Sequence, residues 1–437
     1  MSQANRRMIL NLFLQNGGSH KGAWRHSSTK LDELHDIKYF QRLAKKAEEA
    51  RIDSLFIADG LSIEAKAVQH GPILGFEPLT LLSSIASVTE KIGLIATVST
   101  SFNEPYNVAR ILASLDHISS GRAGWNIVTT GVERTAFNFG LKELPAHAER
   151  YERAKEFIEV ALKLWDSWDA DALIQDKASG IYADARKVHD IQHEGTYFSV
   201  RGALNIMRSP QARPLLIQAG ASEAGRSLAA HYAELIFTVQ QSFEDAQLFY
   251  KDIKKRTAEA GRSPDAIKVL PGLHVLVCAT EAEALEKASE LQQLGSMERA
   301  VMSLSNLLGI DFSVYALDDP FPELPDLSQV NAYQSFYQMV KKIVEKETTI
   351  TIRELLEKHW VGNGQLRIAG TPNQVADLME DWFVNGAADG FSVMPQLASG
   401  GTEAFLELVV PELQRRGLFP DTYSGQTLRE NLGFDPL

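Results

Sequence analysis

Eight short apolar runs, rich in residues that favour β-strands, alternate with longer amphipathic segments through most of this 437-residue chain. Parallel strands need a crossover connection, which is usually a helix, so this alternation is typical of a parallel sheet. It predicts an α/β fold, a TIM-type (β/α)8 barrel with insertions, with a doubly wound open sheet as the competing architecture. The expected strands are residues 9–15, 54–58, 93–98, 123–128, 215–219, 235–239, 267–277 and 390–394. The expected helices are residues 39–50, 78–89, 106–117, 151–168, 223–231, 243–260, 280–294, 372–385 and 403–416.

Three stretches fall outside this repeat, and we interpret them as additions to one barrel domain that spans residues 1–437. They are insertions at about 170–207 and 295–366 and a C-terminal tail at 418–437. The first insertion contains short aromatic segments that suggest a small antiparallel excursion, and the second contains a proline-rich loop followed by more helix. Long insertions usually decorate one face of a barrel, so both are candidate lids.

Charge and composition exclude several classes of function. The formal net charge of -12 and the absence of any Lys/Arg cluster argue against a nucleic-acid partner. The apolar run near the N-terminus, residues 8–14, is too short for a membrane span or a signal peptide, so no membrane partner is expected. A single cysteine, Cys278, cannot form an internal disulfide, and we expect a cytoplasmic protein. We also expect no metal site, since no Cys-x-x-Cys pair exists, and neither a dinucleotide fingerprint nor a Gly-x-Ser-x-Gly elbow is present.

The stretch from Ser119 to Thr130 reads Ser-Ser-Gly-Arg-Ala-Gly-Trp-Asn-Ile-Val-Thr-Thr. By itself it fits a turn, a buried strand and a polar exit loop. Its amino-acid sequence closely resembles the hallmark segment of the bacterial-luciferase-like flavin monooxygenases, in the branch typified by nitrilotriacetate monooxygenase and dibenzothiophene-sulfone monooxygenase. The resemblance extends over nearly the whole chain, from the Trp24-Arg25 loop through residues 218–226 to 387–391 and 427–429.

The resemblance implies an enzyme that binds FMN in its reduced form, FMNH2, and uses O2 to oxidise a small organic substrate. Relatives attack C–S or C–N bonds, and a carboxylate-bearing thioether or amine is the substrate that we expect here. The chain lacks a nicotinamide motif of its own, so the reduced flavin would come from a separate NAD(P)H:flavin reductase. We also expect a homo-oligomer, either a dimer or a tetramer.

Polar residues near the ends of the second, third and fourth expected strands are candidate flavin ligands by this resemblance. They are Asp59, Ser101 and Asn126. The residues alone leave a plainer interpretation open, because an Asp-Gly pair often forms a turn and hydroxyls near strand ends are often satisfied locally.

Two further groups match the positions that bind the ribityl and phosphate parts of the flavin in relatives. His147 and Tyr151 are four residues apart, so on a helix they share one face, although they could simply stack on that helix surface. Ser222, Gly225 and Arg226 follow an expected strand at the start of a helix, where free N–H groups can bind a phosphate. Helix capping alone would also explain Ser222.

The glycine-rich first loop supplies the candidates for the substrate side of the flavin, His20, Trp24 and Arg25. Arg25 suits a carboxylate, whereas Trp24 could equally support the loop. Two rival functions stay open: a flavin-binding protein of the same fold without turnover, and a metal-dependent barrel hydrolase or lyase that uses carboxylates such as Asp59.

Overall fold

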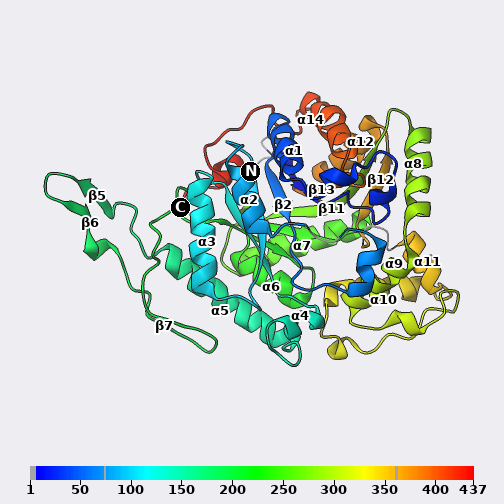
Figure 1. Ribbon diagram of the computed structural model, residues 1–437, viewed down its shortest axis with the longest axis horizontal. Helices are drawn as coiled ribbons and strands as arrows, with labels where there is room; N and C mark the ends of the chain where they lie inside the picture. The colour runs from blue at the N-terminus through cyan, green and yellow to red at the C-terminus, as the bar shows by residue number, and fades with distance from the viewer. Residues whose placement is uncertain (1–5, 73–74, 360–362) are drawn as a thin grey trace.

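Eight parallel strands close into a barrel in the computed structural model, which describes residues 6–72, 75–359 and 363–437 (Figure 1). Around the barrel the order is β1, β2, β3, β4, β9, β10, β11 and β13, and β13 pairs with β1 to close the sheet. The TIM-type barrel predicted from the sequence is confirmed, and each expected strand is present. The strands are β1 (Ile9–Phe13), β2 (Ser54–Ile57), β3 (Gly93–Ser99), β4 (Ala123–Val128), β9 (Leu215–Ala219), β10 (Leu235–Thr238), β11 (Lys268–Val277) and β13 (Gly390–Pro395).

Helices cover the outside of the barrel at the expected places. They are α1 (Ile37–Glu49), α2 (Pro78–Ala86), α3 (Pro105–Ile118), α5 (His147–Trp165), α6 (Glu223–Tyr232), α7 (Phe243–Glu259), α8 (Glu281–Leu294) and α12 (Pro372–Val384). The closing helix is α13 (Gly401–Ala404) and α14 (Val410–Arg415), joined by a π-helical turn over Phe405–Val409. Within the described residues, none of the helices combines the length and apolar composition that crossing a bilayer requires.

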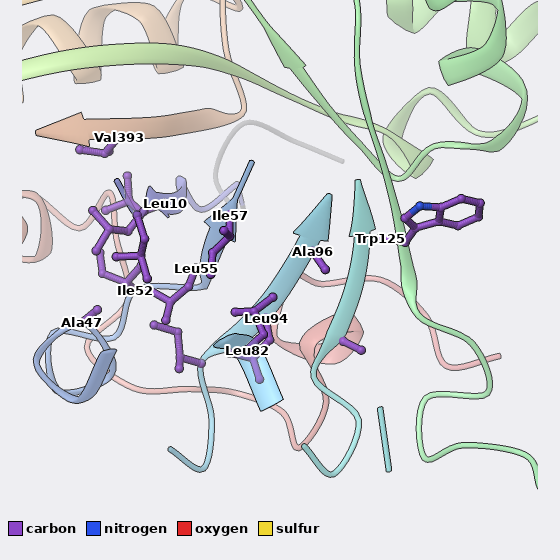
Figure 2. Close-up of a cluster of buried hydrophobic side chains, with 14 of the residues drawn as sticks. Leu10, Ala47, Ile52, Leu55, Ile57, Leu82, Leu94, Ala96, Trp125 and Val393 are labelled. Atoms are coloured by element: carbon purple, nitrogen blue, oxygen red, sulfur yellow. The ribbon is translucent and has the colours of Figure 1, made fainter. Parts of the chain in front are cut away.

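Strand alternation divides the apolar side chains between two cores. Leu10 and Leu55 point outward and pack with Ile52 and Ala47 of the α1 region, as Figure 2 shows. Ile9 and the other residues of the inner core point into the barrel, which the C-terminal tail closes from below. The inner core consists of Ile9, Phe56, Ile95, Leu215, Ile217, Leu235, Phe237 and Leu270, with Leu428 and Leu432 from the tail and α15 (Leu428–Asn431).

The first insertion forms two antiparallel hairpins that extend away from the barrel, at the left of Figure 1. They are β5 (Leu173–Asp176) with β6 (Ile181–Ala183), and β7 (His193–Glu194) with β8 (Ser199–Val200). The predicted antiparallel excursion is confirmed.

The first insertion also carries the one His-x-x-x-His spacing of the sequence, at His189 and His193. His189 contacts Asp169 at 2.9 Å, and His193 contacts Glu156 at 3.1 Å. The two rings therefore have separate partners.

The described part of the second insertion packs around a small core of its own against the barrel mouth. It contains α9 (Met297–Leu308), α10 (Gln334–Lys346) and α11 (Ile352–Lys358), held together by Leu304, Val340 and Leu355. The insertion ends at a strand that the sequence analysis did not expect, β12 (Leu366–Gly370), which pairs in parallel with β11 outside the closed barrel. Its side chains are mostly half-buried, so it lacks the continuous apolar pattern that marks the barrel strands.

Closure of the barrel requires a glycine at position 390. Gly390 lies opposite Ile9 in the register between β13 and β1. A Cβ atom there would stand 1.9 Å from the Ile9 carbonyl oxygen, which belongs to the backbone and cannot rotate away. The two strands can therefore approach closely enough only without a side chain at this position.

We predict that Gly390→Ala lowers the free energy of unfolding by about 3 kcal/mol, because the added methyl group forces β1 and β13 apart. Gly202→Ala is the matched control: its Cβ would meet nothing closer than 3.9 Å, so a change within about 0.5 kcal/mol is expected. Denaturant unfolding followed by circular dichroism measures both. Equal stability of the two variants would contradict this role of Gly390.

Candidate active site

A cavity of about 150 Å³ opens at the carboxyl ends of β2, β3 and β4. Asp59 lies on its wall together with Thr97 and Ser99 of β3. The second insertion contributes Asn306 and Tyr333 to the same cavity. Because the carboxyl ends of the strands meet at this mouth, residues far apart in the sequence share one enclosed space.

Asp59 lies in the cavity and also forms the turn that its Asp-Gly pair indicates. Its Oδ1 accepts a hydrogen bond of 2.8 Å from the N–H of Gly60. Burial raises the pKa of the Asp59 carboxyl, although this hydrogen bond opposes the shift. The Asp59 side chain is thus a half-buried hydrogen-bonding group in the cavity wall.

Asn126 lies within the barrel below this cavity and is 2% exposed. Its Nδ2 donates to Thr97 Oγ1 at 2.9 Å, whereas its Oδ1 is buried without a partner among the described residues. Ser101 also has a buried hydroxyl without a partner there, but the wall of the cavity contains Ser99 in its place. The hydroxyls on the cavity side of β3 are therefore those of Thr97 and Ser99.

A second, smaller cavity of about 40 Å³ lies at the N-terminus of α6, and it brings together three of the predicted residues: His147, Tyr151 and Ser222. The rings of His147 and Tyr151 are 4.8 Å apart, and the Tyr151 hydroxyl lies 3.5 Å from Ser222 Oγ. A volume of this size holds about three water-sized groups, which suits a compact anion.

Ser222 begins α6, and its Oγ accepts a hydrogen bond from the N–H of Gly225 at 3.2 Å. A Cβ at Gly225 would stand 3.2 Å from both Ser222 Oγ and the Tyr151 hydroxyl, so glycine lets these groups gather at the helix end. Burial lowers the pKa of His147 to about 4, with Arg150 adding to the shift, so the ring is neutral at pH 7.

Arg150 supplies the positive charge of this small cavity, and the sequence analysis missed it. The side chain is 2% exposed and donates from Nη1 and Nη2 to Asn331, while its Nε is buried without a partner among the described residues. The i, i+4 spacing drew attention to His147 and Tyr151, whereas Arg150 shares the same helix face at i+3. That second spacing is the signal that could have revealed it.

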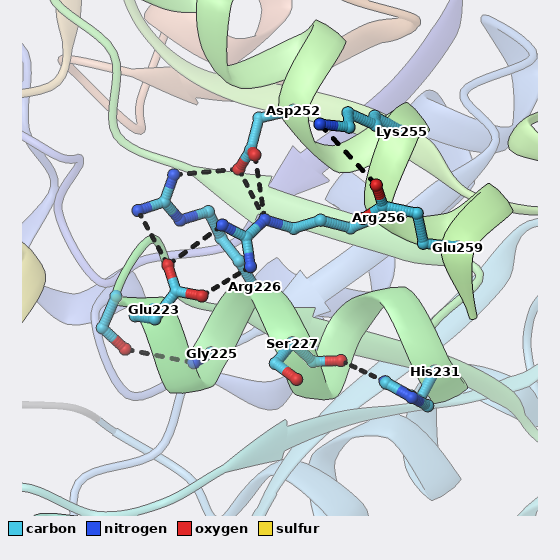
Figure 3. Close-up of polar contacts among 10 residues, drawn as sticks. Glu223, Gly225, Arg226, Ser227, His231, Asp252, Lys255, Arg256 and Glu259 are labelled. Atoms are coloured by element: carbon cyan, nitrogen blue, oxygen red, sulfur yellow. Dashed lines mark hydrogen bonds and ion pairs between the residues drawn. The ribbon is translucent and has the colours of Figure 1, made fainter.

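Arg226 does not line the small cavity, contrary to the contact expected from the sequence. Its guanidinium donates to Asp252 at 2.9 Å and lies 3.6 Å from Glu223, in a network that also includes Arg256 (Figure 3). These carboxylates hold Arg226 between α6 and α7, so it stabilises the helix pair.

A third cavity, of about 240 Å³, lies beside the first and is bordered by the first loop. His20 and Trp24 line it, and the Trp24 indole N–H also donates to the His70 carbonyl at 3.1 Å, so this ring both faces the cavity and supports the loop. Arg25 lies elsewhere, because its guanidinium donates to the Leu294 carbonyl at 3.0 Å. Lys21, next to His20, takes a place on the cavity wall.

The three cavities form one row. Val128 and Tyr333 border both the smallest cavity and the first, and Ser62, Glu64 and Asn306 border both the first and the third. The row has an arginine and a helix N-terminus at one end, and basic residues at the other end. The middle has hydroxyls, the carboxylate of Asp59 and the ion pair of Glu64 with Arg134. Such an arrangement suits an elongated ligand with a terminal phosphate, next to space for a second molecule.

Sequence and structure comparisons with known proteins match flavin enzymes or monooxygenases. The family model described as luciferase-like monooxygenase matches residues 12–390. The chain is 46% identical to N-acetyl-S-(2-succino)cysteine monooxygenase of Bacillus subtilis (strain 168), over 100% of this chain and 98% of that protein. It is 42% identical to nitrilotriacetate monooxygenase component A of Aminobacter aminovorans, over 98% and 97%. Among solved structures, a riboflavin lyase crystallised with modified FMN and riboflavin superposes with a TM-score of 0.87 at 32% identity, covering 98% of this chain and 96% of that one.

Below the mouth, His274 makes the stability of the protein depend on pH. Its Nδ1 lies 2.9 Å from Ser19 Oγ, and burial lowers its pKa from 6.5 to about 3. As pH falls below 6.5 the unfolded state takes up a proton that the folded state excludes, so stability falls by about 1.4 kcal/mol per pH unit.

We predict that the contribution of His274 to stability is about 2 kcal/mol smaller at pH 5 than at pH 7. His274→Gln, which keeps a hydrogen-bonding group, should flatten the fall in denaturant midpoint between these pH values, whereas the exposed control His231→Gln should keep the wild-type slope. A wild-type slope in His274→Gln would show that His274 is not the group responsible.

Proposed function

Because the chain belongs to the luciferase-like monooxygenases, a family of flavin-dependent monooxygenases, we propose that it is the oxygenase component of an FMNH2-dependent two-component system. The observation that supports this proposal is the row of cavities with a buried arginine and a helix N-terminus at one end. The separate NAD(P)H:flavin reductase is supported by the designation "component A" of the nitrilotriacetate relative. We propose that the protein acts in the cytoplasm.

The residues of the row fit FMN. At the small cavity, Ser222 and the free N–H groups of α6 would bind the phosphate, with Arg150 neutralising its charge. The neutral ring of His147 and the hydroxyl of Tyr151 would contact the ribityl and phosphate side. Arg150 Nε is buried without a partner among the described residues, and a phosphate bound here could accept its hydrogen bond.

The flavin ring would then occupy the first cavity, beside Asp59 and the hydroxyls of β3. Asp59 would accept a hydrogen bond at the ring edge. Asn306 and Tyr333, from the second insertion, would cover the ring and exclude water. When bound, FMNH2 supplies the two electrons with which O2 is split, one oxygen atom entering the substrate and the other leaving as water.

The proposed substrate is a small thioether or amine that carries carboxylates. N-acetyl-S-(2-succino)cysteine and nitrilotriacetate, the compounds named for two relatives, both belong to this class. Insertion of oxygen at the carbon next to sulfur or nitrogen gives a hemithioacetal or hemiaminal, which collapses to a carbonyl compound and a free thiol or amine. The protein's part is to hold that carbon near the flavin ring and to keep the space dry.

The proposed activity is tested by supplying photoreduced FMNH2 and air-saturated buffer with N-acetyl-S-(2-succino)cysteine or nitrilotriacetate. We expect release of thiol or secondary amine, approaching one per FMNH2 consumed, with little hydrogen peroxide. Tight binding of FMNH2 with all oxygen recovered as hydrogen peroxide, for every thioether and amine tried, would instead favour a flavin-binding protein without turnover.

We predict that Arg150→Met weakens binding of FMNH2 by roughly 10- to 100-fold, because a charge-assisted hydrogen bond to the phosphate contributes about 1.5–3 kcal/mol. Arg150→Lys should lose less, since it retains the charge. The matched control is Arg110→Met on exposed α3 surface, which should bind like the wild type. Anaerobic fluorescence titration measures the affinities, and unchanged affinity in a folded Arg150→Met protein would remove Arg150 from the phosphate site.

A further inference from the structure

The third cavity, which the first loop borders, contains two cationic side chains that no carboxylate of the described residues neutralises. Lys21 lines this cavity and also the adjoining one bordered by Gln292 and Ser296. Within the described part of the chain, its ammonium group has no hydrogen-bond or ion-pair partner. Water reaches the side chain inside the cavity, yet the surrounding protein and Arg299 lower the pKa of Lys21 to about 8.

Arg299, at the start of α9, is the second cation. Its guanidinium donates to the carbonyls of His70 at 3.2 Å and Pro72 at 2.8 Å, which fixes its position but leaves its charge unpaired by any described carboxylate. A Cβ at Gly71 would stand 2.2 Å from Arg299 Nη1, so a glycine in the loop after β2 lets the guanidinium lie there. Arg299 is therefore a preorganised cation.

The acidic group on the same wall is already paired. Glu64 is the one carboxylate among the described residues that line this cavity, and it forms an ion pair with Arg134. His20 adds no charge at pH 7, because burial lowers its pKa to about 4. The wall thus carries a surplus of two positive charges from Lys21 and Arg299.

A neutral hydrogen-bond donor completes this set. Asn16 lines the cavity, and its Nδ2 is buried without a partner among the described residues. An ammonium, a guanidinium and an amide N–H together provide donors and charge that match carboxylate oxygens. Lys21 and Arg299 repel each other, and an anion between them would relieve that repulsion.

We propose that Lys21 and Arg299 bind two carboxylates of the substrate, and that Lys21 in particular makes the site selective for dicarboxylates. This inference rests on the proposed function, because the cavity adjoins the proposed flavin site through Ser62 and Asn306. The carboxylates lie at the outer end, so the carbon to be oxidised faces the flavin. Lys21 takes the role that the sequence suggested for Arg25, whose guanidinium is bound to Leu294 instead.

Calorimetric binding of three probes to the FMN-loaded protein tests this selectivity. The probes are 2-(ethylthio)succinate, its neutral diamide, and ethylthioacetate, which has a single carboxylate. The wild type should bind the diacid at least roughly tenfold more tightly than the diamide, with the monoacid between them, and added salt should weaken the diacid most.

Lys21→Met should weaken binding of the diacid by roughly tenfold or more, leave the diamide unchanged and leave FMN affinity unchanged. Lys21→Arg should retain most of the diacid affinity. Lys30 is an exposed lysine of the same N-terminal segment, so the control variant Lys30→Met should bind like the wild type. The proposal is overturned if the wild type does not bind the diacid or does not discriminate it from the diamide. It is equally overturned if Lys21→Met weakens the diamide as much as the diacid.

Repeating the titration without FMN separates this inference from the proposed function. Selective binding of the diacid by a protein that fails to bind flavin would leave the carboxylate site standing and remove the monooxygenase proposal. Flavin binding and thiol release without selectivity for the diacid would support the monooxygenase proposal and remove the carboxylate site.

Discussion

Pairing of β1 with β13 is the constraint on which the rest of the molecule depends. Without it the eight strands would form an open sheet, and the residues after β2, β3 and β4 would not face the second insertion, which follows β11 and α8. Two buried carboxylates fasten the strand pairs on either side of this closure, β1 with β2 and β11 with β13. Asp53 accepts from the N–H of Leu10 at 2.8 Å, and Asp389 accepts from the N–H of Val269 at 3.0 Å, so each one ties a neighbouring strand at its start. Closure then brings all the carboxyl ends to one mouth.

At that mouth, some donor and charged groups have no hydrogen-bond or ion-pair partner among the described residues. Arg150 is fixed by Asn331 but keeps one buried donor free, and Lys21 has no partner in the described structure. Leaving a buried donor unpaired costs about 1–3 kcal/mol, and a ligand that pairs with it recovers part of that free energy. The unpaired donor of Arg150 therefore reduces stability in the free protein and favours the phosphate that we propose for this end of the row. Lys21 is reached by water, and its unpaired charge favours the carboxylates that we propose for the other end.

The barrel could be predicted from the sequence because each strand and helix has a local apolar pattern. Asp59 could be placed at the mouth for the same reason, since it follows directly after a strand. β12 was missed because its half-buried side chains give only a weak pattern. The direction of a side chain was harder to predict from the sequence. Arg226 donates to Asp252 on α7, 26 residues away, and Arg25 donates to the Leu294 carbonyl, 269 residues away. The importance of Arg150 and Lys21 depends on which groups the tertiary structure leaves unpaired, and no local pattern records that.

We propose that the row of cavities binds reduced flavin with its phosphate at the N-terminus of α6. The most direct measurement is the anaerobic affinity of the wild-type protein for FMNH2 and for reduced riboflavin, which differ only in the phosphate. We expect FMNH2 to bind at least roughly tenfold more tightly than reduced riboflavin, and we expect inorganic phosphate to compete with FMNH2 but not with reduced riboflavin. Equal affinity for the two flavins would contradict it, because the small cavity with Arg150 and Ser222 would then have no part in flavin binding.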